Sequence, residues 1–316
     1  MILCVGAADP IGGLRMDSER EIDFWKELGA ESARLGFALK RQAWDGGMVR
    51  LDRSTVGVVA STWHLPEPEG LFRALERTHK PVCIWIQDPE AHRSPAGGHR
   101  RLRFHDQGYG KVSGSRLAEH LVSRGHRRLA FLSPWHGSLW SRNRLRGLVE
   151  EASRHGVQVD NFCLDGVSEW DRLAPAWADG RIWKDFPTET IGGILEGPAD
   201  RLREEAIRML AWNRIRRDLE PLFEAALCSE ATAWVGVNDA CALLALEWLR
   251  ARGEHRALAG FDDTAEALRA DLTSFRFDSG AMVRSMLGQI LSSREASGLT
   301  RHEGILVVRG SDRLRR

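Results

Sequence analysis

The sequence is short of tyrosine, of paired cysteines and of long apolar runs. A single tyrosine stands against 12 tryptophans in 316 residues. The five cysteines are scattered and never in CxxC spacing, which argues against a disulfide framework or a zinc site and favours reduced, mostly buried thiols. The longest apolar runs fall far short of the ~20 residues that a membrane-crossing helix needs. These shortages exclude disulfide-rich secreted proteins and helical membrane proteins.

The net charge and the absence of known motifs argue against further classes of protein. The net charge is +1, so no basic field points to nucleic acid. The segment Met1–Ala7 has no basic start and soon reaches Asp9, which makes a poor signal peptide and predicts a cytoplasmic protein. No GxGxxG after a strand, GxxxxGK[ST], HExxH or GxSxG is present. We therefore expect no enzyme, no cofactor and no metal.

Short apolar runs alternate with amphipathic stretches along most of the chain. Apolar residues are 43% of the total and charged residues 28%, as in ordinary soluble proteins. Strands are predicted at Ile2–Gly6, Val56–Ala60, Pro81–Ile86, Arg101–Phe104, Leu129–Leu132, Ala233–Val237, Arg256–Gly260, Leu272–Phe277 and Ile305–Val308. Helices are predicted at Glu19–Leu35, Leu71–Thr78, Gly108–Arg124, Ser141–His155, Arg201–Ala226, Ala240–Arg252 and Ser279–Ser293.

Continuous apolar strands are buried on both faces, and joined by helices they form parallel sheets. The length suits two lobes, so the predicted fold class is α/β with two doubly wound parallel sheets. Ligands of such folds bind beyond the carboxyl ends of the strands.

Polar residues gather where three predicted strands end. Asn238-Asp239 follows one strand, Asp262-Asp263 follows another, and Trp135, Trp140 and Arg144 follow a third. Helix capping by itself explains one residue of each acidic or amide pair, and core packing is the commoner role of any one tryptophan. An arginine in the segment 142–146 can likewise have no ligand and lie on the solvent-exposed face of a helix.

Taken together, the same residues suit a polyhydroxylated ligand. Carboxylate and guanidinium groups bind hydroxyls in bidentate fashion, an amide both donates and accepts, and an indole face covers the apolar side of a sugar ring. Trp63, Trp135 and Trp140 are the candidates for ring stacking.

An ordered set of motifs extends from Asp106 to the C-terminus. The motifs are Asp106-Gln-Gly108, AEHLVSRGHRRLAFLS (118–133), RLRG (144–147), WVGVNDACALLAL (234–246), LAGFDD (258–263), LTSFRFD (272–278) and ILVVRGS (305–311). In this order they resemble the effector-binding core of the lactose/galactose-repressor (LacI/GalR) family of bacterial transcriptional regulators. Ile2–Gln87 shares the resemblance loosely.

The resemblance implies a type I periplasmic-binding-protein-like fold with three crossovers between lobes, near Pro134, Asp278 and Ser297. The expected first lobe is residues 1–134 with 279–297, and the second is 135–278 with 298–316. The resemblance also implies a homodimer and a small effector, carbohydrate-like, bound between the lobes.

Residue roles follow from the matching motif positions. Arg144, Asn238 and Asp262 match family positions that contact the effector, and Asp239 then fits the role of helix cap. Asp106 matches an aspartate that is equally well structural or ligand-adjacent.

The chain departs from the family pattern in three places. We expect no DNA-binding helix-turn-helix in this chain, so DNA would be bound only through a domain not present in it. The connection 7–20 lacks the family's NPF pattern, and the stretch 167–212 resembles an insertion. The identity of the effector therefore does not follow from the effectors of related proteins.

The sequence predicts the effector-sensing and dimerisation domain of a bacterial transcriptional regulator. The alternatives are a solute-binding protein for sugar uptake, a free-standing sensor and, as a more distant third, an enzyme.

Overall fold

The computed structural model describes residues 1–7, 19–63, 65, 67–87, 101–165, 216–292 and 298–313. The chain divides into two compact units, each made of discontinuous segments. The first contains Met1–Tyr109 and Phe277–Ile305, and the second contains Gly110–Arg276 and Leu306–Arg316. Each unit is built on one six-stranded sheet.

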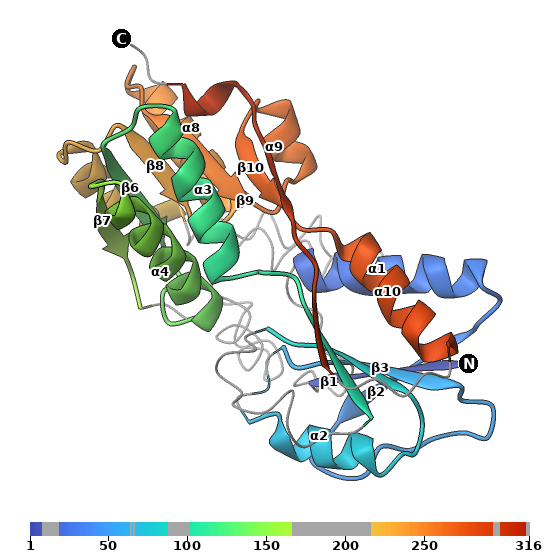
Figure 1. Ribbon diagram of the computed structural model, residues 1–316. Coiled ribbons are helices and arrows are strands. Elements are labelled where there is room, and N and C mark those ends of the chain that lie inside the picture. Colours follow the sequence, from blue (N-terminus) through green and yellow to red (C-terminus); the bar gives the residue numbers. More distant parts are fainter. Residues whose placement is uncertain are drawn as a thin grey trace, which may run out of the picture. The chain divides into compact units, whose positions relative to one another are not determined.

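The first sheet has the strand order β11-β5-β4-β3-β1-β2, and all of its neighbouring strands are parallel. Its strands are β1 (Ile2–Ala7), β2 (Leu39–Trp44), β3 (Gly57–Ser61), β4 (Val82–Trp85), β5 (Leu102–Asp106) and β11 (Gly298–Arg301). Its helices are α1 (Glu19–Arg34), α2 (Glu69–Glu76) and α10 (Ser279–Leu291). In Figure 1, α1 and α10 lie side by side on one face of this sheet and α2 lies on the other.

The second sheet has the order β12-β10-β9-β8-β6-β7. Its strands are β6 (Arg128–Ser133), β7 (Gln158–Cys163), β8 (Ala233–Gly236), β9 (Ala257–Phe261), β10 (Thr273–Arg276) and β12 (Ile305–Val307). Its helices are α3 (Lys111–Ser123), α4 (Leu139–Arg154), α8 (Asp239–Ala251) and α9 (Ala265–Arg269), with residues 216–227 also helical and a 3₁₀ turn at Gly310–Asp312. In both sheets the second strand along the chain lies outside the first and the sixth returns to the opposite edge, so the two units share one topology.

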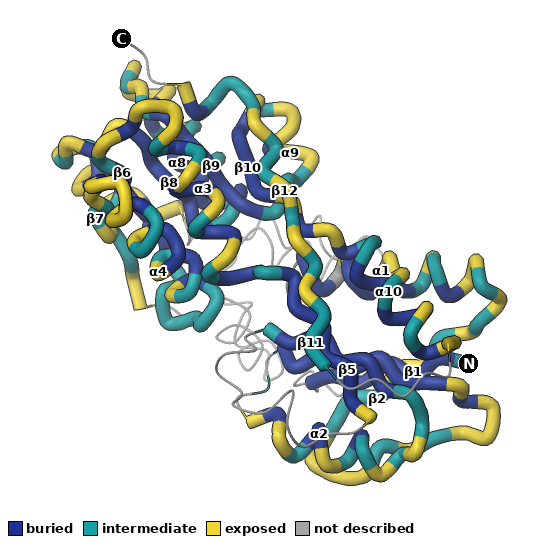
Figure 2. Tube along the Cα trace, in the orientation of Figure 1, coloured by how far each residue is buried: buried dark blue, intermediate teal, exposed yellow. Residues whose placement is uncertain are grey.

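Burial explains which strands the sequence predicted. Every residue of β1, β3, β4, β5, β8 and β9 is buried, and these strands are dark along their length in Figure 2. The edge strands β2, β7 and β11 have partly exposed residues and no continuous apolar run, so the sequence did not predict them. The predicted fold class, two parallel sheets with covering helices, is confirmed.

Helices α3 and α4 pack unusually closely. A Cβ at Gly114 would lie 2.1 Å from the carbonyl oxygen of Arg144, and one at Gly147 would lie 2.0 Å from that of Lys111. Both clashes are with backbone, which no side-chain rotation relieves. The two glycines therefore fix the distance between the helices, and with it the position of Arg144 on α4.

The predicted lobe boundaries need correction. The structure places the first crossing after Tyr109 rather than near Pro134, because α3 packs on α4 and β6 lies in the middle of the second sheet. The second crossing, after Arg276, is close to the prediction. The third lies after Ile305 rather than near Ser297, because β11 pairs with β5 of the first sheet.

Buried polar contacts hold the returning C-terminal segment in the second unit. Asp312 is fully buried, and its carboxylate contacts His120 and, at 3.6 Å, Arg124. The Asp312 carbonyl accepts from the His126 ring at 3.2 Å, and the same ring contacts Thr232 Oγ1 at 2.9 Å. The end of the chain is thereby tied to α3 and to the entry of β8.

None of the described helices combines the length and apolarity that crossing a membrane requires.

The close α3–α4 approach yields a test. Gly147→Ala should destabilise the second unit by roughly 1–3 kcal/mol, because overpacking forces the backbones apart. Gly288→Ala is the matched control, since Gly288 is exposed on α10 with no atom within 4 Å of the new Cβ. It should stabilise by about 1 kcal/mol through helix propensity. Differential scanning calorimetry measures both, and equal effects would contradict the packing argument.

Candidate functional site

The candidate site lies in the second unit, where β6, β8 and β9 end. The chain continues into Trp135 and α4 after β6, into Asn238 and α8 after β8, and into Asp262 and α9 after β9. Because these strands are parallel neighbours, their carboxyl ends meet at one edge of the sheet. This edge is where doubly wound folds bind ligands.

Arg144 is the central residue of this edge. Its side chain is fully buried, and its guanidinium lies over the ring of Phe261, with Cζ 4.4 Å from the centroid. Nη1 donates to the carbonyl of Val237, and Nη2 lies 3.5 Å from Oδ1 of Asp262. A buried charge is costly unless it is paired, so Asp262 and the Val237 carbonyl together compensate this guanidinium.

The segment after β9 has an unusual backbone. Asp262 and Asp263 both have positive φ, +105° and +52°, a region that aspartate and asparagine tolerate better than other side chains. Asp262 N donates to the Phe275 carbonyl at 2.9 Å, and Asp263 N donates to Ser274 Oγ at 3.0 Å. These bonds hold the turn so that the Asp262 carboxylate stays 12% exposed beside Arg144.

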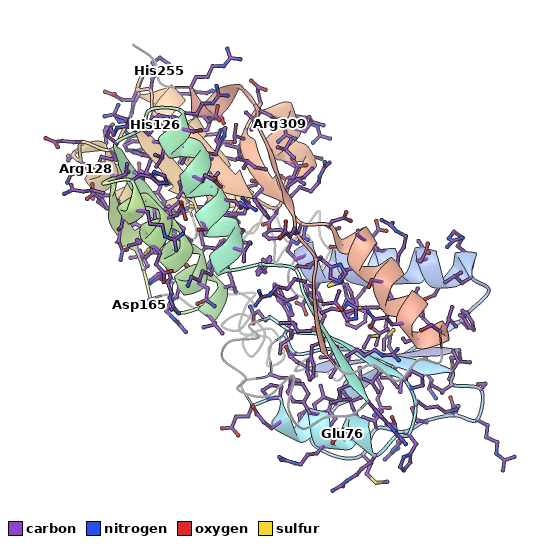
Figure 3. All side chains as sticks on the ribbon, in the orientation of Figure 1. Glu76, His126, Arg128, Asp165, His255 and Arg309 are labelled. Atoms are coloured by element: carbon purple, nitrogen blue, oxygen red, sulfur yellow. The ribbon has the colours of Figure 1, made fainter. Side chains whose placement is uncertain are left out.

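The neighbouring Asp263 points to different partners. Its carboxylate pairs with Arg309 at 2.5 Å and lies 3.6 Å from Arg276. Arg309, labelled in Figure 3, belongs to the segment that follows β12. Asp263 therefore anchors the returning segment, and Asp262 is the carboxylate beside Arg144, while the predicted contact of Asp262 with an effector stays a prediction.

The capping role predicted for Asp239 belongs to Asn238. Asn238 is the N-cap of α8, and its Oδ1 accepts from Cys241 N at 2.9 Å. The side-chain oxygen of Asn238 is thus engaged, while contact of this residue with an effector stays a prediction. The physical reason is geometric, because the first residue of the helix already has helical dihedrals and the residue before it reaches the free N–H groups.

Asp239 is instead a fully buried acid. Its Oδ1 accepts from the Ser274 hydroxyl at 2.6 Å and its Oδ2 accepts from Thr264 N at 2.8 Å. Burial, reinforced by the nearby Asp262 carboxylate, raises the pKa of Asp239 to about 7. The local sequence does not predict this role, because the partners of Asp239 belong to β10 and to the start of α9, which come later in the chain.

Two of the three predicted stacking residues lie near Arg144. The Trp140 ring is half-buried, with Arg144 Cζ 5.1 Å from its centroid, and the Trp135 ring lies 6.2 Å from that of Trp140. Trp63 belongs to the first unit, where it is 3% exposed and packs against Trp85 and Tyr109. Trp63 is a core residue in this structure, and its ligand role stays a prediction.

Asp106 ends β5 in the first unit. Its Oδ1 accepts from Gly108 N at 2.8 Å, and its Oδ2 lies 3.9 Å from Arg301 of β11. These contacts support the structural one of the two roles considered for it. The connection 7–20 and the 167–212 stretch, which the sequence marked as unusual, fall almost entirely outside the described residues.

A cavity of about 790 Å³ opens at the opposite, amino-terminal edge of the second sheet. It is lined by residues that precede or begin β8, β9 and β10, among them Glu230, Arg256, Asp271 and His255, the last labelled in Figure 3. Several of its charges are already paired, Glu230 with Arg128 and Arg256 with Glu254. We favour the Arg144 edge as the functional site, because its charges are buried and converge from three strand ends.

In the described part of the chain, no three His, Cys, Asp or Glu side chains are grouped in a way that could hold a metal ion.

Comparison with known families identifies the fold. Residues 118–311, more than half of the chain, match the family described as "Periplasmic binding protein-like domain". The chain belongs to this family. The matched region contains Arg144, Asn238 and Asp262, and the earlier resemblance to LacI/GalR regulators agrees with it. No curated protein matches the chain.

Solved structures extend the similarity to the whole chain. A LacI-family regulator from Enterococcus faecium with bound ribose is 12% identical, with 100% of both chains covered and a TM-score of 0.61. A sugar-binding LacI-family regulator from Escherichia coli complexed with phosphate is 17% identical over 99% of both chains, with a TM-score of 0.58. A periplasmic binding protein/LacI regulator from Alkaliphilus metalliredigens with D-xylulofuranose is 12% identical over 98% of both chains, with a TM-score of 0.53. At these identities the similarity establishes the fold.

Asp239 gives this family member a testable pH dependence. An aspartate whose pKa rises from 3.8 in the unfolded chain to about 7 stabilises the fold below pH 4, and that stabilisation is lost as pH rises toward 7. Asp239→Asn keeps acceptor and donor capacity without a charge. The melting temperature of the wild type should fall relative to that of Asp239→Asn between pH 5 and pH 8. Parallel pH profiles of the two proteins would contradict the raised pKa.

Proposed function

We propose that this chain is the effector-sensing domain of a bacterial transcriptional regulator and that it binds a small carbohydrate. The observation that carries the proposal is the buried Arg144–Asp262 pair at the carboxyl edge of the second sheet. The family membership and the sugar-bound structures of the same fold support it.

The chemistry of this edge suits hydroxyl groups. Asp262 accepts hydrogen bonds from vicinal hydroxyls, Arg144 donates, and the Asn238 amide both donates and accepts. The half-buried ring of Trp140, with Trp135 beside it, offers an apolar face for a sugar ring. Because these groups are largely desolvated, a ligand that leaves them unpaired binds weakly, which gives selectivity.

Regulation would follow from differential affinity. An effector that binds one arrangement of the two units more tightly shifts the population toward it, and a dimer transmits that shift to a DNA-binding domain. Homodimerisation, cytoplasmic location and DNA binding through a domain outside this chain all belong to the proposal. The expectation that the effector lies between the units stays a prediction.

Two alternative functions, a solute-binding protein and an enzyme, make different predictions from those of a sensor. A solute-binding protein for sugar uptake shares the fold but needs export, so the reading frame upstream of Met1 distinguishes it from a regulator. An enzyme of this fold would convert the bound sugar, and incubation of sugar with protein followed by chromatography tests that. The family is described as periplasmic binding protein-like, which favours binding over catalysis, and the solved structures of the same fold are described as LacI-family regulators, which supports the sensor.

Asp262→Asn tests the site. Alanine is unsuitable here, because it would sit at φ +105° and would leave Arg144 Nη2 without the side-chain acceptor that Asp262 provides, whereas asparagine keeps an amide oxygen. Asparagine tolerates the backbone and keeps the side-chain volume. A panel of mono- and disaccharides should stabilise the wild type by ~2.7 kcal/mol at ~100 times the dissociation constant. The variant should lose most of that ligand-induced shift in thermal denaturation.

Asp271→Asn is the matched control. Asp271 also has positive φ, +57°, and its carboxylate accepts from Gly310 N at the rim of the amino-edge cavity. Its substitution should leave the ligand-induced shift unchanged. If Asp271→Asn loses the shift and Asp262→Asn keeps it, the effector binds at the opposite edge and the site assignment is wrong.

A further inference from the structure

The buried carboxyl group of Asp239 holds the turn that carries Asp262. Asp239 is the first residue of α8 and is fully buried. Its Oδ2 accepts from Thr264 N at 2.8 Å, and its Oδ1 accepts from the Ser274 hydroxyl at 2.6 Å. The same hydroxyl accepts from Asp263 N at 3.0 Å. Asp239 therefore fixes the two backbone N–H groups that follow Asp262, one of them directly and the other through Ser274.

The strand backbone leaves room for this acid and little else. A Cβ on Gly260 of β9 would clash with Asp239 Oδ1 and would lie 3.1 Å from Asp239 Cα. Ser274, on the other side of the carboxyl group, is also fully buried. Because no solvent separates Asp239 from the turn, a change in its charge acts on the turn with little screening.

The group formed by Asp239, Asp262 and Arg144 contains one more acid than base. Arg144 Nη2 lies 3.5 Å from the Asp262 carboxylate, and within the described part of the chain no cation forms an ion pair with Asp239. With both acids ionised the group carries a net negative charge, and with a proton on Asp239 it is neutral. A buried charge without a partner is costly, so the geometry favours the protonated form of Asp239.

The remaining charged groups nearby are paired with one another. Asp263 of the turn pairs with Arg309 at 2.5 Å and lies 3.6 Å from Arg276 of β10. Among the described residues, Asp262 is therefore the neighbour whose charge acts on Asp239.

The pKa of Asp239 agrees with this count of charges. Burial, and then the Asp262 carboxylate, raise the pKa to about 7, against the hydrogen bonds from Ser274 and Thr264, which lower it. Asp239 therefore changes charge near neutral pH. Its ionisation strengthens the two hydrogen bonds that hold the turn and adds repulsion toward Asp262, so the state of the proton is felt at the candidate site.

We propose that Asp239 is a proton-dependent positioning residue and that binding of a neutral sugar at Asp262 takes up a proton from solvent. A sugar that covers Asp262 removes water and leaves the charges in place, which increases the repulsion between the two acids. Asp239 then holds its proton more tightly, and by linkage the affinity for the sugar falls as pH rises through neutrality. The coupling to binding rests on the proposed function, whereas protonation of Asp239 rests on the geometry of the second unit.

Isothermal titration calorimetry on the full chain tests the coupling. Ribose, glucose, galactose and cellobiose are titrated at pH 5.5, 7.5 and 8.5 at constant ionic strength. A sugar that binds should bind roughly fivefold to tenfold more weakly at pH 8.5 than at pH 5.5. Heats measured at pH 7.5 in HEPES and in Tris, whose ionisation enthalpies differ, should correspond to an uptake of about half a proton per sugar. Constant affinity, or release of protons, contradicts the proposal.

Asp239→Asn assigns the proton to this residue. The amide keeps the size of the side chain and stays uncharged, so the affinity should change less than about twofold over the same pH range and the proton uptake should vanish. Asp271→Asn removes a carboxylate from the opposite edge of the same sheet and should keep the wild-type pH profile. A pH profile that survives in Asp239→Asn contradicts the proposal.

Ser274→Ala keeps the acid and decides the question if Asp239→Asn does not fold. It removes a hydrogen bond that favours the ionised form of Asp239, so the midpoint of the pH dependence of binding should move to higher pH. A substitution that only loosened the turn would weaken binding equally at every pH. An unchanged or lower midpoint overturns the proposal.

Nuclear magnetic resonance without sugar separates this inference from the proposed function. In protein labelled with ¹³C at the aspartate carboxyl groups, the resonance that Asp239→Asn removes, or that Ser274→Ala moves, should titrate near pH 7. If a sugar binds but this resonance titrates at the ordinary pKa of aspartate, about 4, the sensor stands and the inference is overturned. If none of the four sugars binds, the proposed function fails and the coupling fails with it, while titration near pH 7 still upholds the protonated acid.

Discussion

The candidate site depends on the burial of one guanidinium. Arg144 is fully removed from solvent at the end of a parallel sheet, and a charge in that position requires compensation from its surroundings. The Val237 carbonyl, the Asp262 carboxylate and the Phe261 ring provide it. These three groups come from the ends of two neighbouring strands, β8 and β9. The burial of the guanidinium is therefore compensated only when these two strands lie side by side in the sheet.

Close packing sets the position of that charge. Gly114 and Gly147 let the backbones of α3 and α4 approach to a distance that any side chain at these positions would prevent. Arg144 lies one turn before Gly147 and is held by the same contact. The site is therefore preorganised by helix packing as well as by its own hydrogen bonds, which is the arrangement that gives a binding site selectivity.

Three aspartates at this edge show how environment assigns roles to identical side chains. Asp263 pairs with Arg309 and anchors the returning segment. Asp239 is buried between a hydroxyl and a backbone N–H, close to another acid, and its pKa rises to about 7. Asp262 keeps partial exposure and lies beside the Arg144 guanidinium. Three identical side chains thus differ in burial and in hydrogen-bond partners.

The sequence by itself determined the central strands, most helices and the residue types at the strand ends. Continuous apolar runs identify strands buried on both faces, and the parallel sheet then places Arg144, Asn238 and Asp262 at one edge. Edge strands β2 and β7 were not predicted because none of their residues is buried and neither strand has a continuous apolar run.

Only the tertiary structure decided which neighbour does what. The carboxylate of Asp239 is buried and paired because Ser274 and Thr264, which are distant in sequence, surround it. The unit boundary falls at Tyr109 because α3 packs on α4, a contact that no local pattern encodes. Local sequence fixes periodicity and burial tendency, whereas the partner of a polar group depends on segments that meet only when the chain is folded.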